Sequence, residues 1–274
     1  MIHLKTSEEI ALIKVACEAL SDWMEDCIAR LQNGDYYSGM HIKEDFIEYA
    51  ASLNEPNKAW KMPFSWQKNN AGEEFGSPVC ISVNDEIVHS RPTNIKFAPG
   101  DVITVDAGLS YYGWNADMAR TAIFGSKNNA ERAIPAHTKL INSCRNALYQ
   151  AYDQCIPGNK IRDISTAISQ EAKKHHFGVV LDYTGHGIGK NLHEEPRICN
   201  APDIFSQYDS IILRPGMVFC LEPLFTLNNR HTTKAPDDWR VWTQDGSIAV
   251  HFESEILITQ EGHEVLTKLT GEYS

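Results

Sequence analysis

A repeated strand signal constrains how this 274-residue chain can fold. Pro99-Gly-Asp-Val-Ile-Thr-Val-Asp106 and Pro215-Gly-Met-Val-Phe-Cys-Leu-Glu222 share Pro, Gly and Val at equivalent positions, and each closes on an acidic residue. Each segment predicts a turn followed by an apolar strand that ends on a carboxylate. Two such segments, 116 residues apart (215 minus 99), indicate an internal duplication.

The same order of elements surrounds both copies. Helical spacing of apolar residues precedes each copy, over about residues 6–53 and 130–175, and a later strand supplies a second acid, Asp117 or Glu253. The chain therefore predicts two related αβ halves that pack around a pseudo-two-fold axis and direct two acids each toward the centre.

This pattern predicts one α+β domain over residues 1–274, with halves of about 1–125 and 126–274. Four helices are expected, and the first begins at a capping box formed by Thr6 and Glu9. They span about residues 6–34, 43–53, 130–154 and 161–175. The stretch 54–76 contains four aromatic residues and predicts an ordered loop or irregular hairpin.

Composition excludes several classes of protein. A net charge of −11 argues against a nucleic-acid surface, and no apolar run reaches the roughly 20 residues of a membrane span. The N-terminus lacks the pattern of a signal peptide. Seven cysteines without a Cys-x-x-Cys pair predict reduced, mostly buried thiols in the cytoplasm.

A glycine-rich stretch, Thr184 to Pro196, holds His186 and His193. Glycines on both sides of His186 remove side-chain bulk and allow close approach to a ligand. Alone, the stretch fits a glycine-rich turn with two surface histidines equally well. It is not a dinucleotide fingerprint, because no strand-then-helix frame surrounds it.

Four converging carboxylates would repel one another in a shared pocket. They are Asp106, Asp117, Glu222 and Glu253. Two divalent cations would neutralise them, and His186 would add one nitrogen ligand, a set that favours Mn, Fe, Co or Zn. His89 and His193 then remain for substrate contact and transition-state stabilisation.

Several motifs together resemble the type I methionine aminopeptidases. They are Tyr183-Thr-Gly-His-Gly-Ile-Gly, Leu192-His-Glu-Glu-Pro196, Pro215-Gly-Met-Val-Phe-Cys-Leu-Glu-Pro223 and His251-Phe-Glu253. The resemblance covers nearly the whole chain. It implies the pita-bread (creatinase/aminopeptidase) fold, with two pseudo-symmetric halves around a curved antiparallel sheet. It also implies removal of N-terminal methionine from peptides and nascent proteins by a bridging hydroxide on a dinuclear metal centre.

The resemblance assigns roles to individual residues. The implied metal ligands are Asp106, Asp117, His186, Glu222 and Glu253. The implied catalytic residues are His89, His193 and Glu222, with Glu222 as proton shuttle. The implied substrate contacts are Cys80, His89, His193 and Trp239. We expect a monomer that binds peptide N-termini and neither nucleic acid nor membrane.

Departures from the family pattern leave the strictness of methionine preference open. Ser90 replaces a usual glycine, Leu192 replaces a common phenylalanine, and the segment ahead of Cys80 differs. The resemblance implies that these positions face the substrate, and the ligand set is intact.

Two other functions compete with this interpretation. Asp106-Ala-Gly108 and Ala119-Arg-Thr121 are more like Xaa-Pro aminopeptidases and dipeptidases of the same fold. Those proteins carry an extra N-terminal domain, for which we expect no room here, and an arginine where this chain has His251. A non-catalytic binding protein on the same scaffold would be expected to have broken ligands, whereas all five are present.

Overall fold

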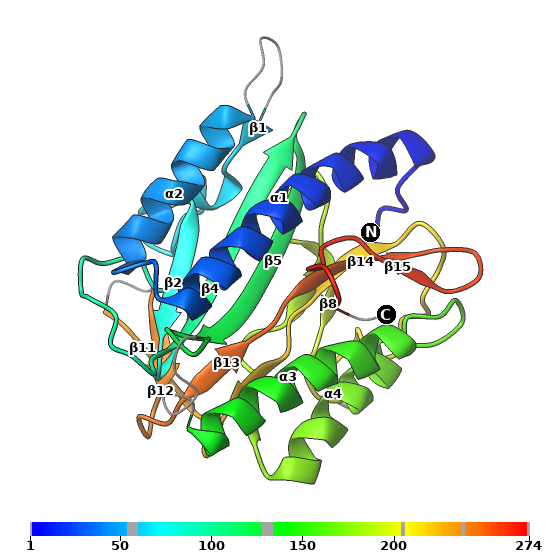
Figure 1. Cartoon of the computed structure of the whole chain (residues 1–274). Coiled ribbons are helices and arrows are strands. Elements are labelled where there is room, and N and C mark those ends of the chain that lie inside the picture. Colours follow the sequence, from blue (N-terminus) through cyan, green and yellow to red (C-terminus); the bar gives the residue numbers. More distant parts are fainter. Residues whose placement is uncertain (1, 54–59, 128–133, 204–205, 237–238, 273–274) are drawn as a thin grey trace.

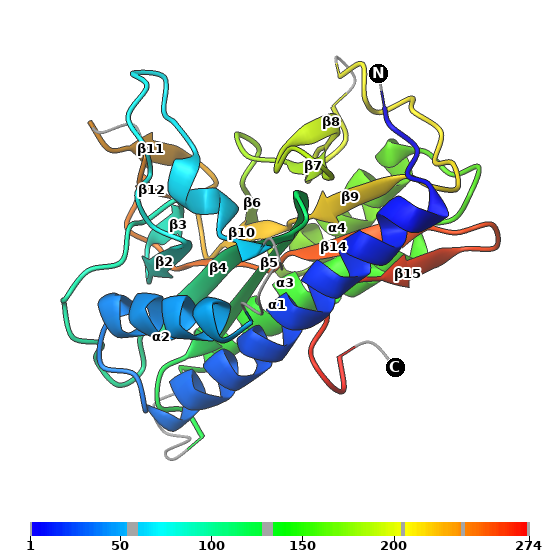
Figure 2. The same ribbon diagram turned by 90° about the horizontal axis from the view of Figure 1, so that it is seen from above.

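A computed structural model of the chain describes residues 2–53, 60–127, 134–203, 206–236 and 239–272. Its helices cover one face of a set of antiparallel strands, and the loops between strands gather on the other face (Figures 1 and 2). The long helices are α1 (Ser7–Asn33), α2 (Gly39–Ser52), α3 (Pro135–Asp153) and α4 (Ile161–His175).

Two sheets carry most of the strands, and every pairing is antiparallel. The first has the order β1–β4–β2 with β5 on β4; its strands are β1 (Trp60–Lys61), β2 (Val79–Val83), β4 (Val102–Tyr111) and β5 (Trp114–Ile123). The second has the order β15–β14–β9–β7–β8; its strands are β7 (Gly185–Gly187), β8 (Glu194–Ile198), β9 (Val218–Leu221), β14 (Ser254–Ile258) and β15 (His263–Val265).

Short strands complete the fold. β6 (Gly178–Val179), β10 (Leu224–Thr226) and β13 (Ala249–His251) form one small sheet; β3 (Glu86–Val88), β11 (Thr232–Lys234) and β12 (Val241–Thr243) form another. A single bridge between Ala119 and Glu253 joins β5 to the segment that leads into β14. The two larger sheets therefore meet at a residue predicted to bind metal.

Helix α1 begins and ends where its sequence predicts. Thr6 and Glu9 form the reciprocal capping box, and Gly34 closes the helix with φ 85°, a left-handed conformation that favours glycine. Buried residues such as Leu20 and Met24 pack against the sheet of β4 and β5. The helix thereby covers the face of that sheet opposite the carboxylates.

The boundaries of other elements differ in part from expectation. α4 spans the predicted residues, whereas α2 begins at Gly39, because Ser38 caps it through a side-chain bond to the His41 amide. The α3 segment predicted from residue 130 is described only from 134, where Pro135 opens the helix.

The prediction that Asp106 ends its strand is wrong. β4 continues five residues further, so Asp106 lies in its middle, and Asp117 likewise lies inside β5. The strand continues because both its faces are covered. α1 lies on one side, and Phe64 packs on the other, where a Cβ at Gly108 would lie 2.6 Å from the Phe64 ring.

The aromatic loop ahead of β2 has defined structure from residue 60 onward. β1 pairs with the end of β4, η1 (Pro63–Trp66) follows, and Lys68 bridges Glu74. The prediction of an ordered loop is confirmed from residue 60 onward. Residues 54–59, which the same prediction covered, lie outside the described residues. Within the residues that the structure describes, no helix is both long and apolar enough to cross a membrane.

We predict that Gly185→Ala destabilises the fold. A Cβ at Gly185 would lie 2.3 Å from the carbonyl oxygen of Cys220, so the backbone of β7 or β9 would have to move. Overpacking against backbone costs about 3 kcal/mol. Chemical denaturation measures the loss. Gly262→Ala is the matched control, since nothing lies within 4 Å of its Cβ position. Equal stability of the two variants would contradict the described packing.

Candidate metal centre

The register of β4 and β5 brings two carboxylates to one face of the sheet. Asp106 is opposite Ala119 and Asp117 is opposite Gly108, so the two aspartates are diagonal neighbours on adjacent strands. Cys80 of β2 is directly opposite Asp106. Asp106, Asp117 and Cys80 are all buried, although each aspartate has an ionisable carboxyl group.

His186 of β7 faces the acids of both sheets. Its Nε2 atom lies 4.0 Å from Asp117 Oδ2, 3.7 Å from Glu222 Oε1 and 3.9 Å from Glu253 Oε1. Its Nδ1 atom lies 3.0 Å from the carbonyl oxygen of Gly187 and donates to it when Nδ1 carries the proton. That tautomer directs the unprotonated Nε2 toward the carboxylates, as a metal ligand requires.

Several carboxylate oxygens at this point have no hydrogen-bond partner among the described residues. They are Asp106 Oδ1, Asp117 Oδ1 and Glu253 Oε1. Buried polar atoms are normally satisfied, and leaving a carboxylate oxygen bare costs more than leaving a neutral group bare. A set of carboxylate oxygens with one imidazole nitrogen is suited to binding divalent cations.

The electrostatics lead to the same conclusion. Burial raises the pKa of Asp106, Asp117 and Glu222 well above its usual range, and the charges of the neighbouring acids raise it further. Burial raises the pKa of Glu253 to about 7, against the lowering effects of the Cys220 thiol and Arg120. Without cations, these groups hold protons that cations would displace.

All nine residues that the sequence singled out line one cavity of about 240 Å³. They are Cys80, His89, Asp106, Asp117, His186, His193, Glu222, Trp239 and Glu253. The structure thus brings together the predicted metal ligands, catalytic residues and substrate contacts. A larger hollow of about 690 Å³ lies elsewhere and contains none of the nine.

The histidines beside the acids are neutral near pH 7. Burial lowers the pKa of His89 to about 4 and of His186 to about 3, and it lowers the pKa of His193 as well. The His193 ring packs edge-on against His186 with centroids 4.4 Å apart. His89 adopts φ 57°, an uncommon conformation outside glycine that often marks functional residues.

Two residues near the acids were missed as site residues. The Cys220 sulfur groups with atoms of Asp117, His186 and Glu253, all within 4.8 Å of one another. His251 is buried in the cavity wall; neither ring nitrogen has a hydrogen-bond partner among the described residues, and Nε2 lies 3.7 Å from Glu253 Oε2. Period-two alternation was the available signal, because Cys220 precedes Glu222 by two and His251 precedes Glu253 by two.

Apolar side chains form one wall of the cavity. Phe75 and Trp239 lie with ring centroids 5.0 Å apart, and Phe64 and Leu192 line the same space. The aromatic residues of the loop ahead of β2 therefore contribute directly to the site. This wall gives the cavity a place for an apolar side chain beside the acids.

Buried carboxylates around one imidazole define a metal-dependent class of protein, and comparisons with known proteins name it. Residues 11–260 match the metallopeptidase family M24. The chain belongs to this family. Membership implies the use of divalent metal.

The similar proteins of known name are methionine aminopeptidases. The chain is 38% identical over 212 residues to that of Aquifex aeolicus, with 77% of each chain covered. It is 34% identical to that of Mycoplasma capricolum, over 98% of this chain and 99% of the relative.

Solved structures confirm the predicted pita-bread fold. Methionine aminopeptidase from Thermotoga maritima superposes with a TM-score of 0.85 at 31% identity, over 98% of this chain and 100% of that one. A prolidase from Pyrococcus furiosus gives a TM-score of 0.70 at 22% identity, over 97% of this chain and 65% of that one. At that identity the prolidase shows a shared fold alone.

We predict that divalent cations stabilise the protein more at pH 8 than at pH 7. The raised pKa values mean that the folded, cation-free protein retains protons that the unfolded chain releases above about pH 4–5, so its stability falls as pH rises. A cation removes this penalty and binds more tightly as fewer protons compete. The histidines, with lowered pKa values, are neutral throughout this range.

Thermal denaturation with and without Mn²⁺ measures the difference. A cation at about 100 times its Kd adds roughly 2.7 kcal/mol of stability. Asp117→Asn should lose most of the effect, because it removes one charged ligand. A shift in Tm that is the same at both pH values, or that survives in Asp117→Asn, would contradict this account of the site.

Proposed function

We propose that this chain is a methionine aminopeptidase that removes N-terminal methionine from peptides and nascent proteins. The observation that carries the proposal is one cavity in which unneutralised, buried carboxylates and His186 lie beside an apolar wall. An aminopeptidase that acts on methionine uses both features. The acidic floor attracts the free α-amine, and the apolar wall receives the first side chain.

The proposed ligands are the five residues that the sequence assigns. Asp106, Asp117, His186, Glu222 and Glu253 together would hold two divalent cations, of Mn, Fe, Co or Zn. The charge balance supports two, since four carboxylates offset two doubly charged ions. Bound cations supply Lewis acidity and water activated for attack on a peptide carbonyl.

The protein's own residues bind and orient the substrate. The unbranched methionine side chain suits the apolar wall formed by Phe75, Leu192 and Trp239, and Cys80 lines the same cavity. His89 and His193 line the same cavity, from which a neutral imidazole can donate a hydrogen bond. We assign His89 to contact with the peptide and His193 to the scissile carbonyl.

Proton transfer is assigned to Glu222 and oxyanion stabilisation to His193. A neutral imidazole N–H can donate to the carbonyl oxygen as negative charge develops, and burial strengthens that interaction. Glu222 Oε1 lies 3.7 Å from His186 Nε2, inside the cluster of proposed ligands, and from there it is placed to accept a proton and pass it to the leaving amine.

Further proposals concern context and origin. The cytoplasm is the proposed location, supported by seven cysteines, all of them unpaired. We propose a monomer that binds peptide N-termini and neither nucleic acid nor membrane; the net charge of −11 disfavours phosphate surfaces. We also propose that the domain arose by duplication. Gly100 and Gly216 support this, since both turn ahead of their strands at positive φ.

We predict that the protein loaded with Mn²⁺ or Co²⁺ releases methionine from Met-Ala-Ser peptides. The measurement is a cleavage profile over all twenty residues at the first position, with an N-acetylated peptide as control, since a blocked amine cannot bind the acids. Cleavage of Xaa-Pro peptides without release of methionine would overturn the assignment in favour of the prolidase-like alternative. No cleavage of any peptide would favour a binding protein.

A further inference from the structure

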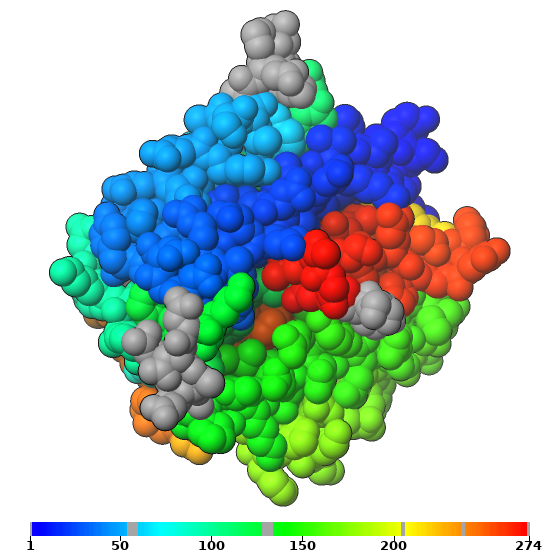
Figure 3. All heavy atoms as spheres, in the orientation of Figure 1, coloured from blue at the N-terminus to red at the C-terminus, as the bar shows by residue number. Residues whose placement is uncertain are grey.

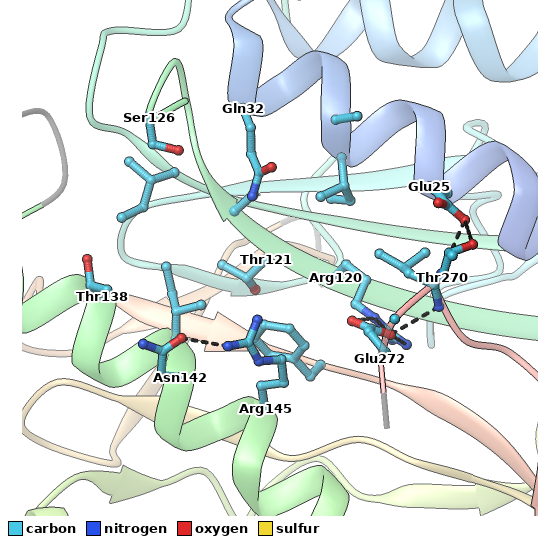
Figure 4. A pocket seen from close by; sticks show the side chains of 18 of the residues that line it. Glu25, Gln32, Arg120, Thr121, Ser126, Thr138, Asn142, Arg145, Thr270 and Glu272 are labelled. Carbon is cyan, nitrogen blue, oxygen red and sulfur yellow. Dashed lines mark hydrogen bonds and ion pairs between the residues drawn. The ribbon is translucent and has the colours of Figure 1, made fainter. Parts of the chain in front are cut away.

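The C-terminal segment, Thr267 to Glu272, lies on the face of the sheet opposite the proposed metal centre. It crosses the surface between α1 and α3 (Figure 3) and borders the hollow of about 690 Å³ (Figure 4). Alternation along β5 explains the position of Arg120, because Asp117 points to the metal side and a residue three positions later points away. Arg120 therefore reaches the side on which the C-terminal segment lies.

Arg120 is bound by Glu272 at one end of its guanidinium group. Its Nε lies 3.0 Å from each Glu272 carboxylate oxygen, and its Nη2 lies 2.6 Å from Oε2 (Figure 4). Arg120 is only 2% exposed. A buried guanidinium requires a counter-charge and acceptors, and Glu272 provides the only acidic side chain in an ion pair with it among the described residues.

At its other end Arg120 holds the backbone around Glu253. Its Nη1 donates to the carbonyl oxygens of Ala119, at 3.0 Å, and of Glu253. The Glu253 amide donates to the same Ala119 oxygen at 2.9 Å. Both backbone polar groups of Glu253 are thus fixed by β5 or by its arginine.

Glu253 depends on this support because it lies outside the regular strands. It falls between β13 and β14 and pairs only through its bridge to Ala119. The direction of the Glu253 side chain therefore depends on the contacts that hold its backbone. The Arg120 guanidinium supplies one of these contacts, which a neighbouring strand would supply in a regular sheet.

The rest of the segment is anchored near the same residues. Thr267 Oγ1 accepts from the Glu255 amide at 2.8 Å. Thr270 donates to Glu25 of α1 through its amide at 3.2 Å and its hydroxyl at 2.7 Å. These contacts hold Glu272 over Arg120, beside the open hollow.

We propose that the C-terminal segment is a positioning element for the metal centre. Glu272 neutralises and orients Arg120, and Arg120 fixes the backbone of Glu253 so that its carboxylate stays directed at the cations. Arg120 and Glu272 are positioning residues, since neither lines the cavity of about 240 Å³ that holds the proposed metal ligands.

Glu272→Gln tests the proposal, because it removes the charge and keeps the size. We expect its affinity for Co²⁺, measured by calorimetry, to fall by roughly three- to tenfold, less than the roughly 10- to 100-fold typical for direct partners of metal ligands. The visible absorption of bound Co²⁺ should change as the ligand geometry changes. Glu272→Asp, which keeps the charge, should recover part of the affinity.

Glu261→Gln is the matched control, an exposed acid near the C-terminal end of the described chain. It should leave both readouts unchanged. A Glu272→Gln protein with a lower Tm but unchanged Co²⁺ affinity and spectrum would overturn the proposal and leave the contact purely structural. The result is independent of which peptides the protein cleaves, because it requires no substrate.

Discussion

Repulsion and desolvation among buried carboxylates are the constraint on which this structure depends. Asp106, Asp117, Glu222 and Glu253 surround His186, and several of their oxygens have no partner among the described residues. Such a cluster is unfavourable in a protein interior unless cations or protons neutralise it. We propose that the cluster is a cation-binding site, in which case the binding of cations would contribute to folding stability.

The architecture shows how such a cluster is built. Two antiparallel sheets meet at the bridge between Ala119 and Glu253, and helices cover the opposite face. Asp106 and Asp117 are inside long, buried strands, whose positions are set by many ladder bonds. Glu222 follows the shorter strand β9, and Glu253 lies between β13 and β14, where Arg120, itself paired with Glu272, bonds its carbonyl oxygen. Arg120 thereby connects Glu253 to the C-terminal segment on the opposite face of the sheet.

Sequence patterns predicted the composition of the site better than its geometry. The repeated turn and strand, with an acid in each copy, predicted that the acids converge, and the structure places all nine selected residues in one cavity. The pattern could not show that β4 continues past Asp106, since this depends on Phe64 packing over Gly108 from another segment. Ser38 was missed as a cap, and so was the position of Cys220 beside the ligands, for which its two-residue spacing from Glu222 was the available signal.

The most direct test of the central claim is an anomalous-difference map from crystals soaked in Mn²⁺. The account predicts two peaks about 3.5–4 Å apart, both among the side chains of Asp106, Asp117, His186, Glu222 and Glu253. A single peak, or peaks away from these side chains, would contradict the assignment of five residues to a two-cation centre.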